Sequence, residues 1–573
     1  MLRIALCLWS VSLVVGMASA GVLVEDGKSA GCIVLPANAP KMVQTAANDL
    51  AGYIRQMSGA SVPIFHDSEP CPGFRILLGS TKLSLVDPSS VTQDKLGYGG
   101  FIVKSIPNGL AIAGGIPRGT ANGVYYFAEE VLGVHWYSVE DNGPSCPQRK
   151  TIRIPELDVT VKPEFAWRSQ YLSFQEGSPA YSQKTAPMAT KLGANRDRWW
   201  AFNRHWGISA DSAHVFFQIV PGDLYDTHPE YFPYINYAFA KDSKKRVYAG
   251  PDGALPAWPF KAGRHKGDNS VQRCLSNPDV LRMAIEYTQQ RFKSDPDLRF
   301  TTLSANDGPW WCECDACKAM GHTETERNLA FANAVARANE RLYPDRGYIF
   351  VAYWDTLEPP VSMKTHPNVV PMIARLWQCR IHPISSNCPD SAYTRRVFKE
   401  WQRTAGRTAF HLYTTPGPFT FPGPVALAEQ MRFLRDSGSI GGFREHQFAP
   451  RVNWQMLAWM EIRLMWDVNQ DPIKLRDQFI EGYYGRKAAP AIRKVYDVIE
   501  TASRQPTHDR TWPKDEGDGL HSVPGEDIFK PIVAQLQDDV DAALREAQSE
   551  REPFKLRIIR DMEMLLGKNK AEF

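Results

Sequence analysis

The stretch LSANDGPWWCECDAC, residues 303–317, brings together residue types that could form a binding site or a structural staple. Asp307 could act as an acid, a base or an orienting carboxylate, although Asn-Asp-Gly is also ordinary turn chemistry. Trp310 and Trp311 could pack on the C–H faces of a sugar ring while one polar edge stays free. The stretch therefore indicates an active site, a metal site or a loop held by disulfides.

A second carboxylate, Glu445, lies in the segment GSIGGFREHQF between Phe443 and Phe448. An isolated glutamate is usually a solvated surface residue. A carboxyl group placed against aromatic rings is desolvated, however, and desolvation favours the protonated form that a general acid needs. Two carboxylates on one face, Asp307 and Glu445, predict glycoside hydrolysis.

The two carboxylates could also serve a substrate-assisted mechanism, in which the substrate's own N-acetyl group is the nucleophile. Asp307 would then orient and polarise that amide, and Glu445 would protonate the leaving oxygen. Both roles require the two side chains to meet across a single pocket.

Other polar and aromatic residues near predicted strand ends are candidates for substrate binding. His214 opens an apolar run, so a structural hydrogen-bonding role is an equal alternative for it, and Glu230 could instead be a buried ion-pair partner. Glu230, Asp355 and Glu313 are the fallback carboxylates. The full set of predicted binding residues is Asn306, His214, Glu230, Trp310, Tyr353, Trp354, Asp355, Arg375, Trp377 and Tyr413.

Cysteine spacing adds a structural motif beside Asp307. The run C-x-C-x-x-C, together with one upstream cysteine, supplies four sulfurs that could bind zinc: Cys274, Cys312, Cys314 and Cys317. Export, argued below, favours disulfides instead. Cys312 and Cys314 are poorly spaced to pair with each other, so one of them would bond Cys274. We assign no metal ligand and expect no cofactor, and either arrangement would hold the loop.

The candidates need a scaffold that gathers distant segments. Strand-like runs at residues 214–220, 298–305, 348–354, 369–376 and 407–415 alternate with helical stretches. Over roughly 300 residues this spacing predicts parallel strands with helical crossovers, and a (β/α)8 TIM-like barrel fits that length better than an open doubly wound sheet. The carboxyl ends of barrel strands form the active face, and the candidates fall there.

The segments before and after this barrel form further domains, so the whole chain is predicted to be an α/β protein of several domains. Short strands and helices alternate before it, and a long amphipathic pattern follows it. The predicted domains are a signal peptide at 1–20, a small N-terminal α/β domain at 21–160, the barrel at 165–470 and a helical region at 471–573.

Composition and the N-terminus bear on location and partners. The chain has 573 residues, 23% of them charged, and a formal net charge of +3 without a basic block, so nucleic acid is not an expected partner.

An apolar run ending in Ala18-Ser19-Ala20 is typical of a cleaved secretory signal, and no later stretch approaches the ~20 apolar residues of a membrane span. The protein is expected to be secreted or periplasmic. Because disulfides form in such compartments, Cys379 and Cys388 are expected to close a short loop through a disulfide.

Several motifs, in order, resemble known families. The segment GIPRGTANGVYYFAEEVLGVHWY is similar to the end of the small domain that precedes the barrel in family 67 α-glucuronidases and family 20 hexosaminidases. HPEYF, CLSNP, SANDG with CECDAC, AYWDTLEPP and LMWDVNQDPIKLRDQFIEGYYG together resemble the domain-of-unknown-function 4838 group. Part of that group is classed as glycoside hydrolase family 163, endo-β-N-acetylglucosaminidases that act on N-glycans.

The resemblance implies a barrel with a retaining, substrate-assisted mechanism and an oligosaccharide or glycoprotein glycan as substrate. Asp307 falls where family 20 enzymes carry an Asp-Glu pair, but this sequence reads Asn306-Asp307-Gly308. The acid must then come from elsewhere, and Glu445 is our choice.

Two other functions stay open. The chain could hydrolyse uronic-acid-containing or other plant or algal glycans, with Arg375 and Arg380 clamping a carboxylate through paired hydrogen bonds. It could also be a non-catalytic carbohydrate-binding protein, in which the aromatic residues alone would hold the glycan.

Overall fold

The chain folds into two compact units, one formed by Met1–Trp136 with Gly143–Pro163 and the other by Tyr137–Asn142 with Glu164–Phe573. The structure is a computed structural model and describes residues 19–81, 86–172, 195–205, 207–211, 214–235, 263–266, 271–308, 310–375, 378–379, 381–414, 422–446, 452–504 and 524–566. Most of the predicted signal peptide and the candidate residues Trp377 and Arg380 lie outside these ranges.

The first unit contains two sheets. One is antiparallel, in the order β2 (Lys28–Ser29), β1 (Ser19–Glu25) and β8 (Ile152–Pro155). The other is mixed and follows the order β4 (Ile64–His66), β3 (Gly31–Leu35), β5 (Phe74–Leu78), β7 (Gly109–Gly114), β6 (Phe101–Ile106) and β9 (Asp158–Val161). Its described residues also form α1 (Lys41–Ser58), α2 (Gln93–Leu96) and α3 (Pro117–Tyr126), with a 3-10 turn η1 (Pro88–Ser90) and a π-helical turn η2 (Phe127–Val131).

Helix α1 is amphipathic, and its sequence sets its C-terminal end. Ala46, Leu50 and Ile54 are fully buried on one face, whereas Met42, which belongs to the same stripe, is exposed. Gly59 ends the helix with φ of 82°, a left-handed conformation that glycine adopts without strain. A disulfide joins Cys32 on β3 to Cys71.

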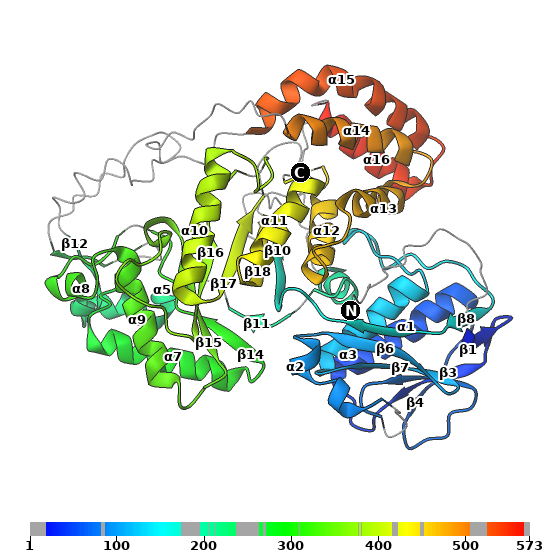
Figure 1. Ribbon diagram of the computed structural model, residues 1–573, viewed down its shortest axis with the longest axis horizontal. Coiled ribbons are helices and arrows are strands. Elements are labelled where there is room, and N and C mark those ends of the chain that lie inside the picture. Colours follow the sequence, from blue (N-terminus) through cyan, green and yellow to red (C-terminus); the bar gives the residue numbers. More distant parts are fainter. Residues whose placement is uncertain are drawn as a thin grey trace, which may run out of the picture. The chain divides into compact units, whose positions relative to one another are not determined.

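The second unit is built on seven parallel strands among the described residues. Their order is β10 (Trp167–Leu172), β18 (Ser439–His446), β17 (Thr408–Tyr413), β16 (Val369–Ala374), β15 (Gly347–Ala352), β14 (Leu298–Thr302) and β11 (Ser209–Ala210) (Figure 1). Since β10 is first in sequence and pairs with the last strand, the sheet curls into a nearly closed barrel. The barrel prediction is confirmed, with seven described strands in place of the eight predicted.

The ring closes between β10 and β11 through the main chain. The backbone N–H of Ile208 donates to the carbonyl of Ala166 at 2.8 Å. Gly207 makes this approach possible, because a Cβ built there would lie 1.8 Å from the same carbonyl oxygen. Any residue larger than glycine at 207 would push the two strands apart.

Helices follow most strands and cover the outside of the barrel, as the alternating pattern predicts. The crossovers contain α7 (Pro278–Ser294), α9 (Glu324–Asn339), α10 (Pro389–Ala405) and α11 (Pro424–Asp436), and α12 (Trp454–Trp466) follows β18. Shorter helices are α5 (Phe216–Ile219) and α8 (Asp315–Ala319), and β12 (Tyr234–Ile235) pairs with β13 (Gly263–Arg264). The crossover from β15 to β16 carries one 3-10 turn, η5 (Trp354–Thr356).

Inward-facing side chains fill the barrel, as expected for a small barrel. Its interior cluster contains Trp167, Phe300, Val351, Met372, Ala409 and Phe443 among others. Because side chains alternate along a strand, residues two positions beyond this cluster point into the carboxyl-terminal mouth. This alternation places His411, two residues after Ala409, and Glu445, two residues after Phe443, at the mouth.

Two differences from the predicted strands concern local structure. The run 214–220 forms one turn of helix, α5, after a single bridge from His214 to Ser304, because Phe216 and Ile219 bury together at helical spacing. The barrel strands β10 and β11 were not among the predicted runs, since β10 mixes polar residues with its apolar ones and β11 has only two residues.

Four helices end the described chain: α13 (Pro472–Tyr484), α14 (Ala489–Ser503), α15 (Pro524–Ala547) and α16 (Glu552–Leu565), orange to red in Figure 1. On α15, Ile532, Leu536 and Val540 are buried at a spacing of four residues, which agrees with the amphipathic pattern expected after the barrel. Within the part of the chain that the structure describes, none of the helices has the length and apolar character to cross a membrane.

Candidate active site at the barrel mouth

Glu445 and His411 form a polar pair at the mouth of the barrel. Glu445 Oε2 lies 3.0 Å from His411 Nε2, and the two side chains are 17% and 14% exposed. The imidazole stacks on Tyr413 with centroids 4.4 Å apart and contacts the ring of Phe443 at 4.2 Å. Burial lowers the pKa of His411, against the opposing effect of Glu445. A neutral imidazole can donate from Nε2 to an ionised Glu445 or accept at Nε2 from a protonated one, so the pair can hold either form of the carboxyl group.

The outer face of β18 fixes the position of Glu445. Arg444 and Glu461 are both fully buried and form an ion pair at 3.0 Å that links β18 to α12. Arg444 also donates to the Tyr413 carbonyl at 3.1 Å and to Gln430 at 2.8 Å. On the strand's approach, a Cβ at Gly442 would lie 1.8 Å from the Phe410 carbonyl, so only glycine fits there. The backbone that carries Glu445 is therefore held from several sides.

Asn306 holds the loop that follows β14. Its side chain accepts from the N–H of Phe217 at 3.0 Å and donates to the carbonyl of Val271 at 2.7 Å, and the residue is 4% exposed. Gln272 completes the clamp, since its amide donates to the carbonyls of Asn306 and Gly308 and accepts from the N–H of Asn306. The polar atoms of the Asn306 side chain are therefore used to shape the loop.

Asp307, by contrast, projects from this fixed loop as an exposed side chain. In the ring of strands, β14 and β18 stand apart from each other, with β11 and β10 between them on one side and β15, β16 and β17 on the other. Asp307 and Glu445 are thus carried on facing parts of the rim at the same end of the barrel.

A pocket opens beside the Asp307 loop. Its lining does not include Asp307 or Glu445, although both neighbours of Asp307 contribute to it. That Asp307 and Glu445 meet across a single pocket stays a prediction. The lining residues are His214, Ala305, Asn306, Gly308, Trp311, Val351, Tyr353, Trp354, Asp355 and Thr356.

His214 connects this pocket with the Glu445–His411 pair. Its Nδ1 hydrogen-bonds the carbonyl of Ala305, and its ring lies 6.5 Å from that of Tyr353. Its charge when protonated contributes to lowering the pKa of His411, which places the two imidazoles within electrostatic range. His214 therefore anchors the loop through one nitrogen and also lines the pocket, so the structural role and substrate contact are compatible.

Tyr353, Trp354 and Asp355 follow β15 and form another wall of the pocket. Trp354 has φ of 48°, an unfavourable conformation for a residue with a side chain, and such strain concentrates at functional sites. Thr356 supports the turn by accepting from the N–H of Tyr353 and donating to the carbonyl of Val351 at 3.1 Å.

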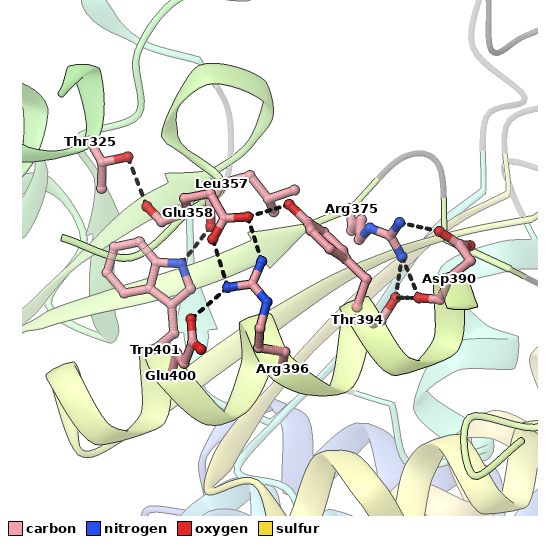
Figure 2. A network of polar contacts seen from close by, with 10 residues as sticks. Thr325, Leu357, Glu358, Arg375, Asp390, Thr394, Arg396, Glu400 and Trp401 are labelled. Atoms are coloured by element: carbon pink, nitrogen blue, oxygen red, sulfur yellow. Dashed lines mark hydrogen bonds and ion pairs between the residues drawn. The ribbon is translucent and has the colours of Figure 1, made fainter. Parts of the chain in front are cut away.

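A polar network outside the barrel anchors the end of this turn to α10 (Figure 2). Trp401 Nε1 donates to the carbonyl of Leu357 at 2.8 Å, and Thr325 donates to that of Glu358 at 2.9 Å. The Glu358 carboxylate accepts two hydrogen bonds from Arg396 at 2.7 and 3.0 Å. This pairing holds the pKa of Glu358 below its ordinary value although burial opposes it.

Arg375 belongs to the same supporting structure rather than to the pocket. Figure 2 shows its guanidinium turned toward Asp390 and Thr394 of α10, where it also donates to the Asp390 carbonyl at 2.9 Å. Its side chain is 10% exposed and lies over the ring of Tyr393. Arg375 therefore supports this region through an ion pair with the largely buried Asp390, and its contact with substrate stays a prediction.

Two other predicted binding residues lie outside the pocket. Glu230 sits in a 3-10 turn with its side chain half exposed and paired with His228 at 3.0 Å. Trp310 pairs through its backbone with Val271, and its neighbour Trp311 lines the pocket instead. The predictions for both residues thus find no support in this pocket, and Tyr413 contributes through its stack on His411.

His411 is a residue that sequence reasoning missed. It lies in the predicted run 407–415, two positions before Tyr413, so alternation along the strand carried enough information to find it. The Glu445 carboxyl group and the imidazole that hydrogen-bonds it are the kind of groups that serve as general acids and bases.

Two clusters in the described chain have side chains suited to a metal ion. One contains the four cysteines of the Asp307 region, and the other contains Cys379, His382 and Cys388. All the cysteines of both clusters are free thiols in this structure. The predicted pairing of Cys274 with one member of the C-x-C pair, and the predicted loop closed by Cys379 and Cys388, are therefore not formed.

Among solved structures, several glycan-active proteins share this fold. The chain aligns over 95% of its length with 73% of BtGH115A, a family GH115 4-O-methyl-alpha-glucuronidase with specificity for decorated arabinogalactans, at 12% identity and a TM-score of 0.56. It aligns over 94% with 68% of a GH138 enzyme targeting pectin rhamnogalacturonan II, at 10% identity and a TM-score of 0.51. For CpGH89 from Clostridium perfringens, the shares are 93% and 61%, with 11% identity and a TM-score of 0.50. At such identities the likeness establishes the fold.

Sequence comparison gives a more direct assignment. None of the curated proteins matches the chain. The sequence profile described as "Domain of unknown function (DUF4838)" matches residues 136–497, which cover the barrel and the helices directly after it. The resemblance found in the sequence motifs is therefore confirmed, and the chain belongs to the DUF4838 family.

Proposed function

We propose that the protein is a glycoside hydrolase, and specifically a retaining, substrate-assisted β-N-acetylglucosaminidase that acts on N-glycans or related glycans. The observation that carries the proposal is the Glu445–His411 pair, at 3.0 Å, at the carboxyl end of neighbouring barrel strands. A part-buried carboxyl group can give its proton to a leaving oxygen and later retake one from water, and a neutral imidazole beside it can hydrogen-bond both forms. The shared fold of glycoside hydrolases supports the class of reaction.

Glu445 is the proposed general acid. As the acetamido oxygen of the substrate attacks the anomeric carbon, the bond to the leaving oxygen breaks and that oxygen takes the proton from Glu445. The resulting carboxylate then accepts a proton from a water molecule, which opens the cyclic intermediate and restores the acid. His411 would stabilise the carboxylate between the two steps by donating from Nε2.

Asp307 is the proposed orienting carboxylate. Its loop is fixed by Gln272 and by the Asn306 side chain, so an exposed carboxylate at its tip has a defined position relative to the pocket. It would accept the acetamido N–H and so turn the amide oxygen toward the anomeric carbon. Asp355, which lines the pocket, is the alternative for this role.

The remaining pocket residues suit a sugar. His214, Tyr353, Trp354 and Trp311 place aromatic surface and polar edges around one opening, which is the composition that carbohydrate rings require. A non-catalytic glycan-binding protein would use the same aromatic residues but would have no need for the Glu445–His411 pair.

Hydrolysis of uronic-acid-containing glycans is the second candidate, since BtGH115A is described as a glucuronidase and shares the fold. This function needs a cation that can clamp the substrate's carboxylate. Arg375 already forms an ion pair with Asp390, so the clamp would have to come from another residue.

We also infer export from the N-terminal sequence, which the Cys32–Cys71 disulfide supports.

A glycan digest with a mass readout tests the class and the substrate together. The purified protein is incubated with native N-glycoproteins and with plant and algal polysaccharides, and aryl glycosides with and without a 2-acetamido group follow. Released N-glycans and strict dependence on the 2-acetamido group support the proposal. Release of uronic acids favours the second candidate, and binding without any product across the panel rejects the enzymatic function.

A further inference from the structure

Four cysteines from two distant segments converge beside the Asp307 loop. Cys274 follows the segment that clamps Asn306, and the other three form the C-x-C-x-x-C run at the start of α8. The sulfur of Cys274 lies 3.8 Å from that of Cys314 and 3.8 Å from that of Cys317, and all four sulfurs lie within 4.8 Å of one another. Cys274, Cys312 and Cys317 are almost fully buried, at 3%, 3% and 2% exposure.

These distances match a tetrahedral thiolate site. Zinc–sulfur bonds are about 2.3 Å long, so two sulfurs of a regular tetrahedron around zinc lie about 3.8 Å apart. A disulfide requires about 2.05 Å, and its partners in this cluster would have to move by almost 2 Å. We propose that Cys274, Cys312, Cys314 and Cys317 form a structural site for one zinc ion, held by four thiolates.

The surroundings of the sulfurs fit this assignment. The backbone N–H of Tyr234 donates to the sulfur of Cys312 at 3.3 Å, and that of Cys317 donates to the sulfur of Cys314 at 3.5 Å. The Ser276 hydroxyl accepts from the Cys317 thiol at 3.2 Å in this structure and can turn its own O–H toward the sulfur once that thiol is deprotonated. Such donors orient thiolate ligands and stabilise their negative charge, as outer partners of metal ligands do.

Charge balance points in the same direction. Binding of zinc displaces the four thiol protons, and the resulting centre carries a net negative charge. The guanidinium of Arg264, which donates to the Phe232 carbonyl and lies within electrostatic range of Cys274, Cys312 and Cys314, offsets part of this charge. With four protein ligands the site is closed, which is typical of structural rather than catalytic zinc.

The site would hold together the two segments that build the candidate active-site loop. Gln272, two residues before Cys274, binds the backbone of Asn306 and Gly308, and Cys312 lies four residues beyond Gly308. The metal would therefore hold the segment after Gln272 and the segment after Gly308 together at one point. Its loss is expected to loosen the loop that carries Asp307 and Trp311.

Metal analysis of the unmodified protein is the first test, and it does not depend on any enzymatic activity. Protein purified without added metal should contain about one zinc ion per chain, as a single closed site binds. A mercurial reagent should release the zinc while it consumes thiols, and cobalt substitution should give the charge-transfer and intense visible bands of tetrahedral thiolate coordination. Protein without zinc that cannot be reconstituted by zinc or cobalt would overturn the proposal.

Single variants locate the ion. Cys314→Ser and Cys317→Ser should each lose the bound zinc and lower the melting temperature. Cys146→Ser, outside the cluster, and Cys388→Ser, in the second cysteine cluster, should keep it. Zinc that persists in both cluster variants, or zinc lost from Cys388→Ser, contradicts the assignment. So do disulfide-linked peptides that join Cys274 to the 312–317 run in a non-reducing peptide map of the wild type.

Discussion

Glu445 and His411 lie on neighbouring parallel strands, and their side chains meet at 3.0 Å although they are not directly paired in register. His411 on β17 stands opposite Phe443 on β18, and Glu445 stands opposite Tyr413, so the contact runs diagonally across the barrel mouth. The stack of Tyr413 on His411 closes the group from the side. A carboxylate held in this way keeps one hydrogen-bond partner inside the protein and one edge toward the mouth.

Glu445→Gln should lower turnover of the glycan substrate by about 100-fold or more, because the variant cannot donate a proton to the leaving oxygen. The change preserves shape and leaves the melting temperature close to that of the wild type. Steady-state kinetics on the substrate found in the digest measure the effect. Glu230→Gln, which alters a half-exposed carboxylate outside the pocket, is the matched control. Equal rates for Glu445→Gln and the wild type would reject Glu445 as the acid.

The free energy of unfolding should fall as the pH drops below about 6.5, and His411 should account for part of that fall. In the unfolded chain His411 titrates near its ordinary pKa of 6.5, whereas burial lowers the pKa in the fold. Between these two values the unfolded state binds the additional proton, so acid favours unfolding, and above 6.5 the effect disappears.

His411→Gln should therefore flatten the pH dependence of stability. Urea unfolding at several pH values between neutral and mildly acidic measures the slope, with His228→Gln, a half-exposed histidine of the same unit, as the control. A slope unchanged by His411→Gln would show that the imidazole does not remain neutral in the folded state.

Asp307→Asn should reduce hydrolysis of 2-acetamido substrates by about 100-fold through loss of the orienting carboxylate, without a change in stability, because the side chain is exposed. Asp297→Asn is a close control, since Asp297 is also exposed and precedes β14 at the opposite end of the same strand. If Asp355→Asn is impaired and Asp307→Asn is not, the orienting role belongs to Asp355.

Arg375→Ala should destabilise the protein by about 2–4 kcal/mol, since it leaves the largely buried Asp390 carboxylate without its partner. Any variant that stays folded should retain the wild-type KM. Arg282→Ala, a mostly exposed arginine on α7, should change the free energy of unfolding by no more than about 0.5 kcal/mol. A large rise in KM without loss of stability would return Arg375 to the substrate site.

The fold could be predicted from periodicity because the barrel strands are short apolar runs between helices. The runs at 298–305, 348–354, 369–376 and 407–415 contain most or all of β14, β15, β16 and β17, since burial from both faces favours such sequences. The run 214–220 did not, because an apolar stretch of that length fits one helical turn equally well. Only the contacts with the rest of the unit decide between the two.

The site was harder to predict because a sequence shows which residues end a strand but not what each side chain contacts. Arg375 directly follows β16 and Glu445 lies near the end of β18, so the two look alike in the sequence. In the fold, Arg375 hydrogen-bonds Asp390, whereas Glu445 hydrogen-bonds His411. Cysteine pairing raised the same difficulty, since the expected compartment favoured disulfides and only the 3.8 Å spacing of the sulfurs distinguishes a metal site.

Gln272 holds the 305–308 loop through backbone groups, namely the carbonyls of Asn306 and Gly308 and the N–H of Asn306. These groups are present whichever side chains the loop carries. None of these bonds uses the side chain of Asp307, so a substitution at 307 removes the carboxylate while the backbone support of the loop stays in place. Chemistry and scaffold are thus separable at this position.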